Sequence, residues 1–316
     1  MKKLILIILL IFISNSVFAQ TIENLKTFKE VATFLEKEIN KEYTFEAIFE
    51  GEDEIDTEDF NEVVQKIDLD NDGDTDLVID YIGDTIFILN KDNDTFKEIK
   101  MLDVSRIYKN EDLESISMER IKNQTFFIRK IKISKFDVEK YKNIIVEKNQ
   151  KDFQYDREKN KVVAVIRDFY FRKDTLVIKY GEFVQLNSKW TKHTNEIKEI
   201  HFEATPCYGS CPAFEMKITS DGNLEYHGKR FVNFKGQKKL KLRSEEVKTL
   251  FRLIEYTDVK SLKDRYAVNA TDNPSAILKV TFKNGDVKEI YDYGRFGTYN
   301  LRVIYKKLFE INNNIK

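Results

Sequence analysis

The chain has 316 residues, with 53 lysines and arginines against 54 aspartates and glutamates, and its formal net charge is −1. The two signs are mixed along the chain, which argues against the clustered basic face of a nucleic-acid-binding protein. A chain of this length predicts two domains of about 100–200 residues each.

The N-terminal segment has the pattern of a cleavable secretory signal. Lys2 and Lys3 precede an unbroken apolar run, Leu4 to Ile13, and Val17-Phe18-Ala19 offers small residues before a cut. The apolar run is too short to cross a hydrocarbon layer of about 30 Å. We therefore predict a signal peptide at residues 1–19, cut after Ala19, and a periplasmic or secreted mature chain with no stable membrane span.

Residues 20–195 are predicted to form an N-terminal domain. Apolar residues at three- and four-residue steps predict an opening helix at Ile22–Ile39. Alternating apolar residues then predict several strands. Among them, Val162–Phe171 and Thr175–Tyr180 are predicted to pair on either side of a turn at Arg172-Lys173-Asp174.

Residues 196–316 are predicted to form a C-terminal domain. A meander of strands is expected from Glu199 to Leu242, and Ser244 begins a helix with acidic residues in its first turn. Asn284-Gly285 is a strong hairpin signal, and an amphipathic helix ends the chain. Strands followed by a helix, a hairpin and a helix predict an α+β fold, with a mainly antiparallel sheet and packed helices in each domain.

Five aspartates alternate through one short segment, and these are Asp68, Asp70, Asp72, Asp74 and Asp76. Two carboxylates about 4 Å apart repel each other by up to about 4 kcal/mol at an effective dielectric constant near 20. A calcium ion turns this repulsion into attraction, because it binds six to eight oxygen ligands. Gly73 allows the sharp turn that such loops need. We predict a calcium site formed by four of the carboxylates and the backbone carbonyl of Asp74.

The spacing of these residues distinguishes two kinds of calcium loop. An EF-hand needs a glutamate at its twelfth position, which here is Ile79 within a predicted strand. The pattern D-x-D-x-D-G-x-x-D-L before a strand instead resembles the calcium loop of FG-GAP and VCBS-type repeats, over residues 68–96. Several such repeats build a β-propeller, but this chain has one copy, so the resemblance implies only the loop and its calcium ion. An acidic, solvated turn is the alternative.

The two cysteines, Cys207 and Cys211, lie in the segment P-C-Y-G-S-C-P-A-F. In an exported protein they predict one disulfide. A redox-active dithiol and a copper site completed by His201 or His227 are the alternatives. A strand pattern follows Pro212, and this weighs against both, because catalytic dithiols usually lie at a helix N-terminus.

The cysteine segment and the strands after it resemble an uncharacterised bacterial domain family with a CYGxCPxF-type motif. The resemblance spans about residues 198–311 and includes the later Asp272-Asn273-Pro274. The family is a domain of unknown function, so the resemblance implies a boundary and a fold but no activity.

Signatures of common enzyme classes are missing from the sequence, including H-E-x-x-H, G-x-S-x-G, G-x-G-x-x-G and the phosphate-binding loop. We predict an exported, non-enzymatic binding or structural module of unknown ligand and partner, with one structural calcium ion. The alternative is a thiol-redox or copper-handling protein that uses Cys207 and Cys211.

Overall fold

A computed structural model describes residues 21–42, 57–81, 84–91, 95–102, 111–133, 144–157, 159–190, 196–268 and 270–316. The predicted signal peptide and its cut after Ala19 lie outside these described residues. The chain divides into two compact units, residues 1–100 and 101–316. The predicted domain boundary between residues 195 and 196 falls inside the second unit and stays a prediction.

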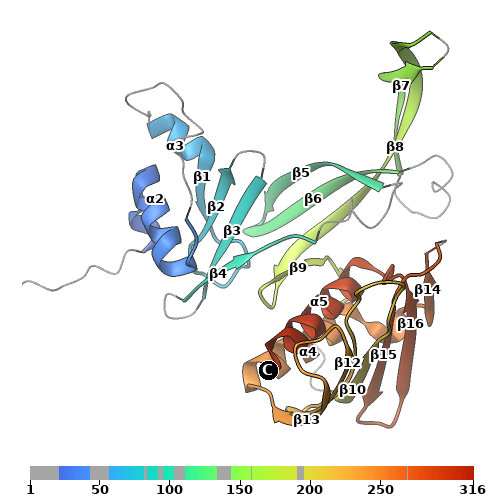
Figure 1. The fold of residues 1–316 in the computed structure, drawn as a ribbon. Coiled ribbons are helices and arrows are strands. Elements are labelled where there is room, and N and C mark those ends of the chain that lie inside the picture. Colours follow the sequence, from blue (N-terminus) through green and yellow to red (C-terminus); the bar gives the residue numbers. More distant parts are fainter. Residues whose placement is uncertain are drawn as a thin grey trace, which may run out of the picture. The chain divides into compact units, whose positions relative to one another are not determined.

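The first unit packs short helical segments on one antiparallel sheet of order β1-β2-β3-β4 (Figure 1). Its elements are η1 (Ile22–Asn24), α2 (Phe28–Phe34), the π-helical turn η2 (Leu35–Ile39), α3 (Thr57–Val63), β1 (Val64–Ile67), β2 (Asp76–Tyr81), β3 (Asp84–Lys91) and β4 (Thr95–Ile99). A capping box between Thr27 and Glu30 satisfies backbone donors at the start of α2.

Apolar residues of α2 and of the sheet form the core of the first unit. Phe28 packs edge-to-face on Phe60, with ring centroids 5.1 Å apart. Leu77 and Ile79 of β2 are fully buried in the same cluster, and Ile88 of β3 joins them. Alternate residues of a strand point to the same face, so β2 turns Leu77 and Ile79 toward the helices. The N-terminal end of β2, where Asp76 lies, is therefore held by a packed core.

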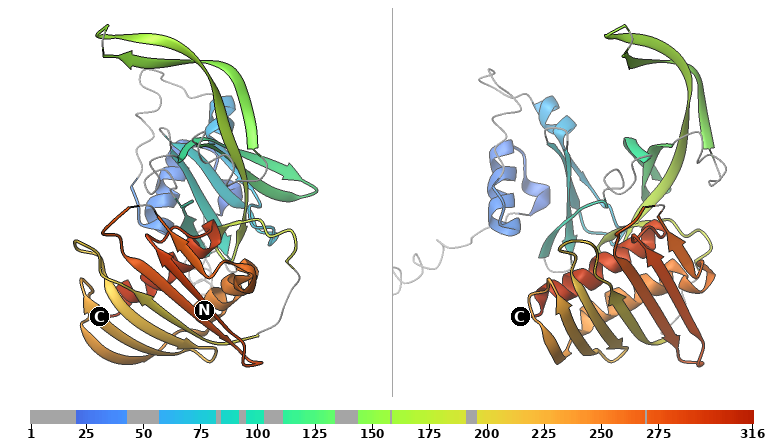
Figure 2. Two further views of the ribbon diagram at one scale, coloured as in Figure 1. Left: turned by 90° about the vertical axis from the view of Figure 1, so that its right-hand side faces the viewer. Right: turned by 45° about the vertical axis from the view of Figure 1, so that its right-hand side comes forward.

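The second unit begins with a sheet of order β5-β6-β8-β7, and β9 pairs with β8. Its strands are β5 (Glu111–Ile121), β6 (Gln124–Ile133), β7 (Ile144–Asp156), β8 (Lys161–Lys179) and β9 (Glu182–Gln185). The first half of β8 pairs only with β7, and Figures 1 and 2 show these two strands running beyond the rest of their sheet. The turn predicted at Arg172-Lys173-Asp174 is wrong, because β8 runs through all three residues.

The rest of the second unit is a seven-stranded sheet with two long helices. Its sheet order is β13-β12-β11-β10-β15-β16-β14. Its elements are β10 (Ile197–Ala204), β11 (Ala213–Thr219), β12 (Asn223–Arg230), β13 (Gly236–Lys241), α4 (Ser244–Thr257), η5 (Val259–Ser261), β14 (Arg265–Ala267), β15 (Ser275–Phe282), β16 (Val287–Tyr293) and α5 (Tyr299–Asn314).

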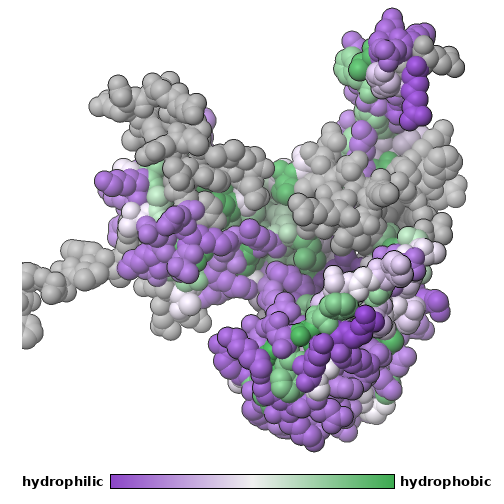
Figure 3. All heavy atoms as spheres, in the orientation of Figure 1, coloured by the Kyte–Doolittle hydropathy of each residue, from purple (hydrophilic) through white to green (hydrophobic). Residues whose placement is uncertain are grey.

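Helix α5 covers one face of this sheet. The ring of Phe202 lies 5.6 Å from that of Tyr305, and the ring of Phe214 lies 5.1 Å from that of Phe309. The neighbouring residues on each strand point to the opposite face. Figure 3 shows that the visible surface of this part of the chain, at the bottom of the view, is mostly hydrophilic.

The antiparallel sheets of the predicted fold class are confirmed, since β14–β16 is the one parallel pair among the described strands. The fold is more β-rich than the predicted α+β class suggests, because the described chain is mostly β-sheet. The difference comes from residues 111–185, whose described part forms five strands and no helix. Among the described helices, none has both the length and the apolar composition for crossing a membrane.

Candidate metal centre

The aspartate segment forms the connection between β1 and β2. Ile67 pairs with Asp76 in the ladder, so the two ends of the loop lie side by side. Asn71 and Gly73 take left-handed backbone conformations, with φ of 63° and 99°. Asparagine and glycine tolerate this region better than other residues, which explains how so short a loop closes.

Two hydrogen bonds inside the loop shape its turns. The Asn71 backbone N–H donates to Asp68 Oδ1 at 2.7 Å, and the Asp74 N–H donates to Asp72 Oδ1 at 3.0 Å. Both are local bonds of the kind that aspartates make in turns. Part of the aspartate pattern is therefore used for turn formation.

Asp76 is the anchor of the loop. Its carboxylate is fully buried and accepts hydrogen bonds from the Leu69 N–H at 2.7 Å and from the Asn90 N–H at 2.8 Å. The first bond joins Asp76 to the start of the loop, and the second joins it to β3. These contacts fix both oxygens of Asp76 beside the loop.

Three carboxylates converge at this place. Asp68, Asp70 and Asp76 each offer an oxygen atom, and the three atoms lie within 4.8 Å of one another. The Asp70 side chain is 9% exposed, and its Oδ2 lies 2.6 Å from Lys91 Nζ. Its other oxygen, Oδ1, is buried and has no hydrogen-bond partner. A buried carboxylate oxygen without a donor is costly, so this atom needs a cation or a proton.

The electrostatics of the cluster also indicate that it needs a cation or a proton. Burial raises the pKa of Asp76 to about 7, and the charges of Asp70 and Asp72 add to the effect, against the two backbone hydrogen bonds. Burial also raises the pKa of Asp70, against the lowering effect of Lys91. Without a metal ion, the cluster would hold a proton near neutral pH.

The predicted ligands divide into two groups. Asp68, Asp70 and Asp76 come together, whereas Asp72 is exposed and Asp74 is not part of the converging group. The oxygen donors that converge are of the type that calcium binds, so the residues fit this ion. Asp72, Asp74 and the calcium ion itself stay predictions.

Sequence reasoning missed Asn90 and Lys91 as members of this site. Both lie in β3, beside the loop only because β3 pairs with β2. The side-chain Oδ1 of Asn90 is buried without a hydrogen-bond partner, as is Asp70 Oδ1. The signal that could have identified them is the polar pair Asn90-Lys91 directly after the apolar run of a strand.

Cys207 and Cys211 form a disulfide, with Cα atoms 5.6 Å apart. The bridge lies between β10 and β11, so neither cysteine begins a helix. Tyr208, inside the short loop that the bridge closes, is 90% exposed. The predicted disulfide is thus present, and the bond occupies the sulfur atoms that a copper site would need.

One family comparison matches the C-terminal part of the second unit. Residues 198–312 match the family model described as a domain of unknown function, DUF6438. This span agrees with the resemblance expected for about residues 198–311, and it brings no activity with it. The match does not reach residues 68–96, so the likeness to FG-GAP and VCBS-type loops stays a prediction. No curated protein matches the chain.

Proposed function

We propose that this protein is an exported, non-enzymatic binding or structural module in which one calcium ion stabilises the loop between β1 and β2. The observation that carries the proposal is the convergence of Asp68, Asp70 and Asp76, with Asp70 Oδ1 buried and unpartnered. These three carboxylates would hold the ion. Its charge would offset their mutual repulsion and keep the loop joined to β3.

Lys91 offers the competing explanation, in which the cluster needs no metal. Its ammonium group supplies one positive charge to Asp70. Three ionised carboxylates and one lysine still leave a net charge of about −2 in a partly buried place, and such charges are strongly disfavoured. A divalent cation matches that charge better than Lys91 alone.

The disulfide supports the proposed location. Disulfides persist mainly in the periplasm, in the secretory pathway and outside the cell. Calcium is compatible with such a compartment, because extracellular modules often bind it with dissociation constants of about 10⁻⁴–10⁻³ M. No observation favours the thiol-redox or copper alternative, and it stays a prediction.

Calcium titration calorimetry of residues 20–316 tests the proposal. We expect binding of one ion with a dissociation constant of about 10⁻³ M or tighter. Asp70→Asn should weaken it by about 10-fold or more, because a carboxylate of the cluster loses its charge. The matched control is Asp80→Asn, an exposed aspartate of β2, which should bind as the wild type does. No binding by the wild type, or equal effects of both substitutions, would contradict the proposal.

Calcium binding should also depend on pH through Asp76. Its pKa in the folded protein is about 7, raised from 3.8, so the ion-free protein holds a proton there below neutral pH. Calcium needs the ionised carboxylate, so the affinity should fall by about tenfold from about pH 8 to about pH 6. Titration in two buffers of different ionisation enthalpy should show that about one proton is released at about pH 6. A pH-independent affinity with no proton release would contradict this assignment.

The raised pKa of Asp76 also makes the stability of the ion-free protein depend on pH. Because the folded pKa lies above the unfolded one, the stabilising contribution of protonated Asp76 is fully present below the unfolded pKa. It is lost as the pH rises through about 7. Chemical unfolding with a chelator present should therefore show that the contribution of Asp76 to the free energy of unfolding declines between about pH 4 and pH 7. Added calcium should raise the free energy of unfolding and so oppose this decline.

A further inference from the structure

The outer parts of β7 and β8 form a two-stranded arm. Residues 150–156 of β7 pair with residues 161–167 of β8, and no other described strand pairs with this part of either. Strand β6 pairs with β8 only over residues 170–176. Figure 2 shows the arm extending beyond the rest of its sheet. A two-stranded ribbon on its own is at best marginally stable in water, so the arm needs a surface to pack against.

One face of the arm is apolar. Three directly opposite pairs place their side chains on it, and these are Lys151–Ile166, Phe153–Ala164 and Tyr155–Val162. The four large apolar side chains are mostly exposed, with values of 65% for Phe153, 64% for Ile166, 63% for Val162 and 54% for Tyr155. Figure 3 shows hydrophobic residues on the surface of the arm, at the upper right of the view. We call these six residues the apolar face.

The opposite face of the arm is covered by its own contacts. Arg167 Nε lies 3.1 Å from Asp152 Oδ2, and Arg167 Nη2 donates to Gln154 Oε1 at 2.9 Å. Val163 and Val165, beside them, are half-buried. Because the charges here are of both signs, this face lacks the basic character with which proteins bind anionic lipid surfaces. The apolar face is therefore the part of the arm that a partner would cover.

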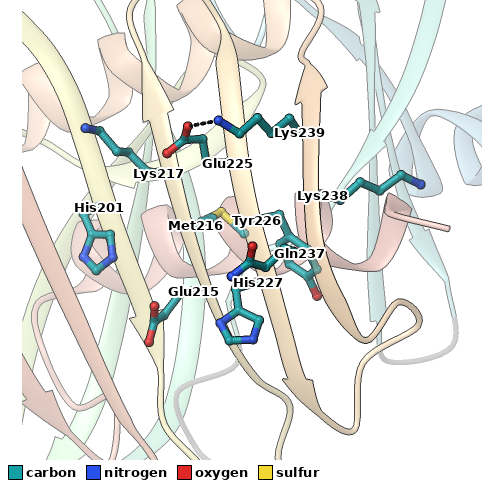
Figure 4. Close-up of a pocket in the computed structure, with 10 residues that line it drawn as sticks. All are labelled: His201, Glu215, Met216, Lys217, Glu225, Tyr226, His227, Gln237, Lys238 and Lys239. Atoms are coloured by element: carbon teal, nitrogen blue, oxygen red, sulfur yellow. Dashed lines mark hydrogen bonds and ion pairs between the residues drawn. The ribbon is translucent and has the colours of Figure 1, made fainter.

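The open face of the seven-stranded sheet provides a comparison within the same unit. Figure 4 shows histidine, lysine and glutamate side chains along β10 to β13, and Lys239 pairs with Glu225 at 2.8 Å. The shallow hollow on this face, of about 600 Å³, is lined largely by these polar groups. Such a face is well solvated without a cover, whereas the apolar face of the arm is not.

The apolar face continues a small buried cluster at the base of the arm. Ile131 and Ile133 of β6 are buried there, and Ile144 and Tyr170 pack against them. Tyr170 and Ile166 are four residues apart on β8, so their side chains point to the same side of the strand. A partner on the arm would therefore extend an existing core.

The exposed area of the apolar face is large enough for an interface. A phenylalanine or tyrosine removes about 150–250 Å² from water when it becomes buried. At exposures of 54–65%, the four large side chains leave roughly 400–500 Å² open to water. This matches the largest apolar patch of a typical monomer, about 300–600 Å². Two such faces packed together would bury roughly 800–1,000 Å², close to the minimum of about 1,000 Å² for a specific interface.

We propose that the apolar face binds the same face of a second copy of this chain around a two-fold axis. A second copy supplies a cover of the same size and character, and a two-fold arrangement closes after two copies. Two sheets pack about 10 Å apart with strand directions within about 30°, so two arms can lie along each other.

Lys151 is the one charged member of the apolar face, and it does not oppose this packing. Its Nζ lies 5.4 Å from the centroid of the Phe153 ring. A lysine stem can lie along apolar surface while its ammonium group stays in water, so Lys151 would lie at the rim of the interface.

Sedimentation equilibrium of residues 20–316 tests the proposal. We expect a dimer with a dissociation constant of about 10⁻⁶–10⁻⁴ M, because the interface is at the small end of the usual range. Ile166→Glu should raise this constant by about 100-fold or more, since the two-fold interface would then bury two carboxylates. The matched control is Gln154→Glu, which adds the same charge at an exposed position on the opposite face and should leave the constant unchanged.

A second variant, Phe153→Ser, adds no charge and should raise the dissociation constant by about 10-fold or more. Both variants should keep the fold of the monomer, because Phe153 and Ile166 are 65% and 64% exposed. The new carboxylate at position 166 would also lie opposite Lys151. Circular dichroism at a concentration below the dissociation constant checks the fold of each variant.

Three results would overturn the proposal. One is a wild type that stays monomeric up to about 10⁻³ M. Another is a dimer that Ile166→Glu and Phe153→Ser leave intact, which would place the interface elsewhere. The third is a monomer that binds phosphatidylcholine vesicles and loses this binding in Ile166→Glu, which would assign the apolar face to lipid.

Discussion

Asp174→Ala should destabilise the second unit by about 3–5 kcal/mol, which is the usual cost of breaking a buried ion pair from one side. Asp174 accepts from Arg129 Nη2 at 2.9 Å, and the side chains are 7% and 1% exposed. Nε and Nη1 of Arg129 are buried without hydrogen-bond partners. The guanidinium carbon of Arg129 lies 4.4 Å from the centroid of the Tyr299 ring, which also stabilises this charge. Without Asp174, a cation would remain buried with no carboxylate beside it.

Urea unfolding of the variant measures this loss. The matched control is Asp152→Ala, because Asp152 pairs with Arg167 at 3.1 Å where the side chains are 32% and 44% exposed. Exposed pairs contribute about 0–1 kcal/mol, so the control should change little. The double variant Arg129→Met/Asp174→Ala should be more stable than Asp174→Ala alone, since it also removes the buried charge. Similar losses for Asp174→Ala and Asp152→Ala would contradict the argument.

Phe202→Ala should cost about 3–5 kcal/mol of unfolding free energy, as expected for a fully buried phenylalanine. Its ring is 0% exposed and lies within about 6 Å, between centroids, of Phe214, Tyr305 and Phe309. The change leaves a cavity between the seven-stranded sheet and α5, and neighbouring rings collapse into such a space only partly.

Thermal unfolding of both Phe202→Ala and a surface variant of the same unit measures this loss against a control. Tyr208→Ala removes an aromatic ring of similar size from a side chain that is 90% exposed. Surface changes of this kind stay within about 0.5 kcal/mol. If Tyr208→Ala were as destabilising as Phe202→Ala, the core would not lie where α5 meets the sheet.

Local patterns predicted the C-terminal part of the chain well. The alternation of Phe214, Met216 and Ile218 corresponds to buried residues of β11, and Asn284-Gly285 lies in the turn between β15 and β16. Helix α4 begins at Ser244, as expected. These elements depend on periodicity and turn residues that neighbours in the sequence supply, so they can be predicted from one sequence.

The errors arose where distant residues decide the structure. Arg172-Lys173-Asp174 has the composition of a turn, yet Asp174 is held inside β8 by Arg129 of β6. The predicted domain boundary between residues 195 and 196 stays a prediction, and long-range contacts are found near it too. Residues 182–185 of β9 pair with β8, and the Gln185 N–H donates to Asn300 Oδ1 of α5 at 2.6 Å. No local signal in the sequence reveals such contacts.

The aspartate loop was predicted in part from the sequence. Alternation of aspartates around Gly73 predicted a cluster, and three of the five do converge. The pattern did not reveal that Asp72 accepts a hydrogen bond from the Asp74 N–H. It also did not reveal Lys91, because the pairing of β2 with β3 brings it to the loop.

A crystal structure of residues 20–316 grown with excess calcium is the most direct measurement of the central claim. The account predicts an ion between Asp68, Asp70 and Asp76, bound by carboxylate oxygens at about 2.3–2.6 Å. It also predicts that Asp70 Oδ1, now without a partner, is one of the ligands. A well-ordered loop with no ion, in which Lys91 and a protonated Asp76 alone balance the charges, would contradict it.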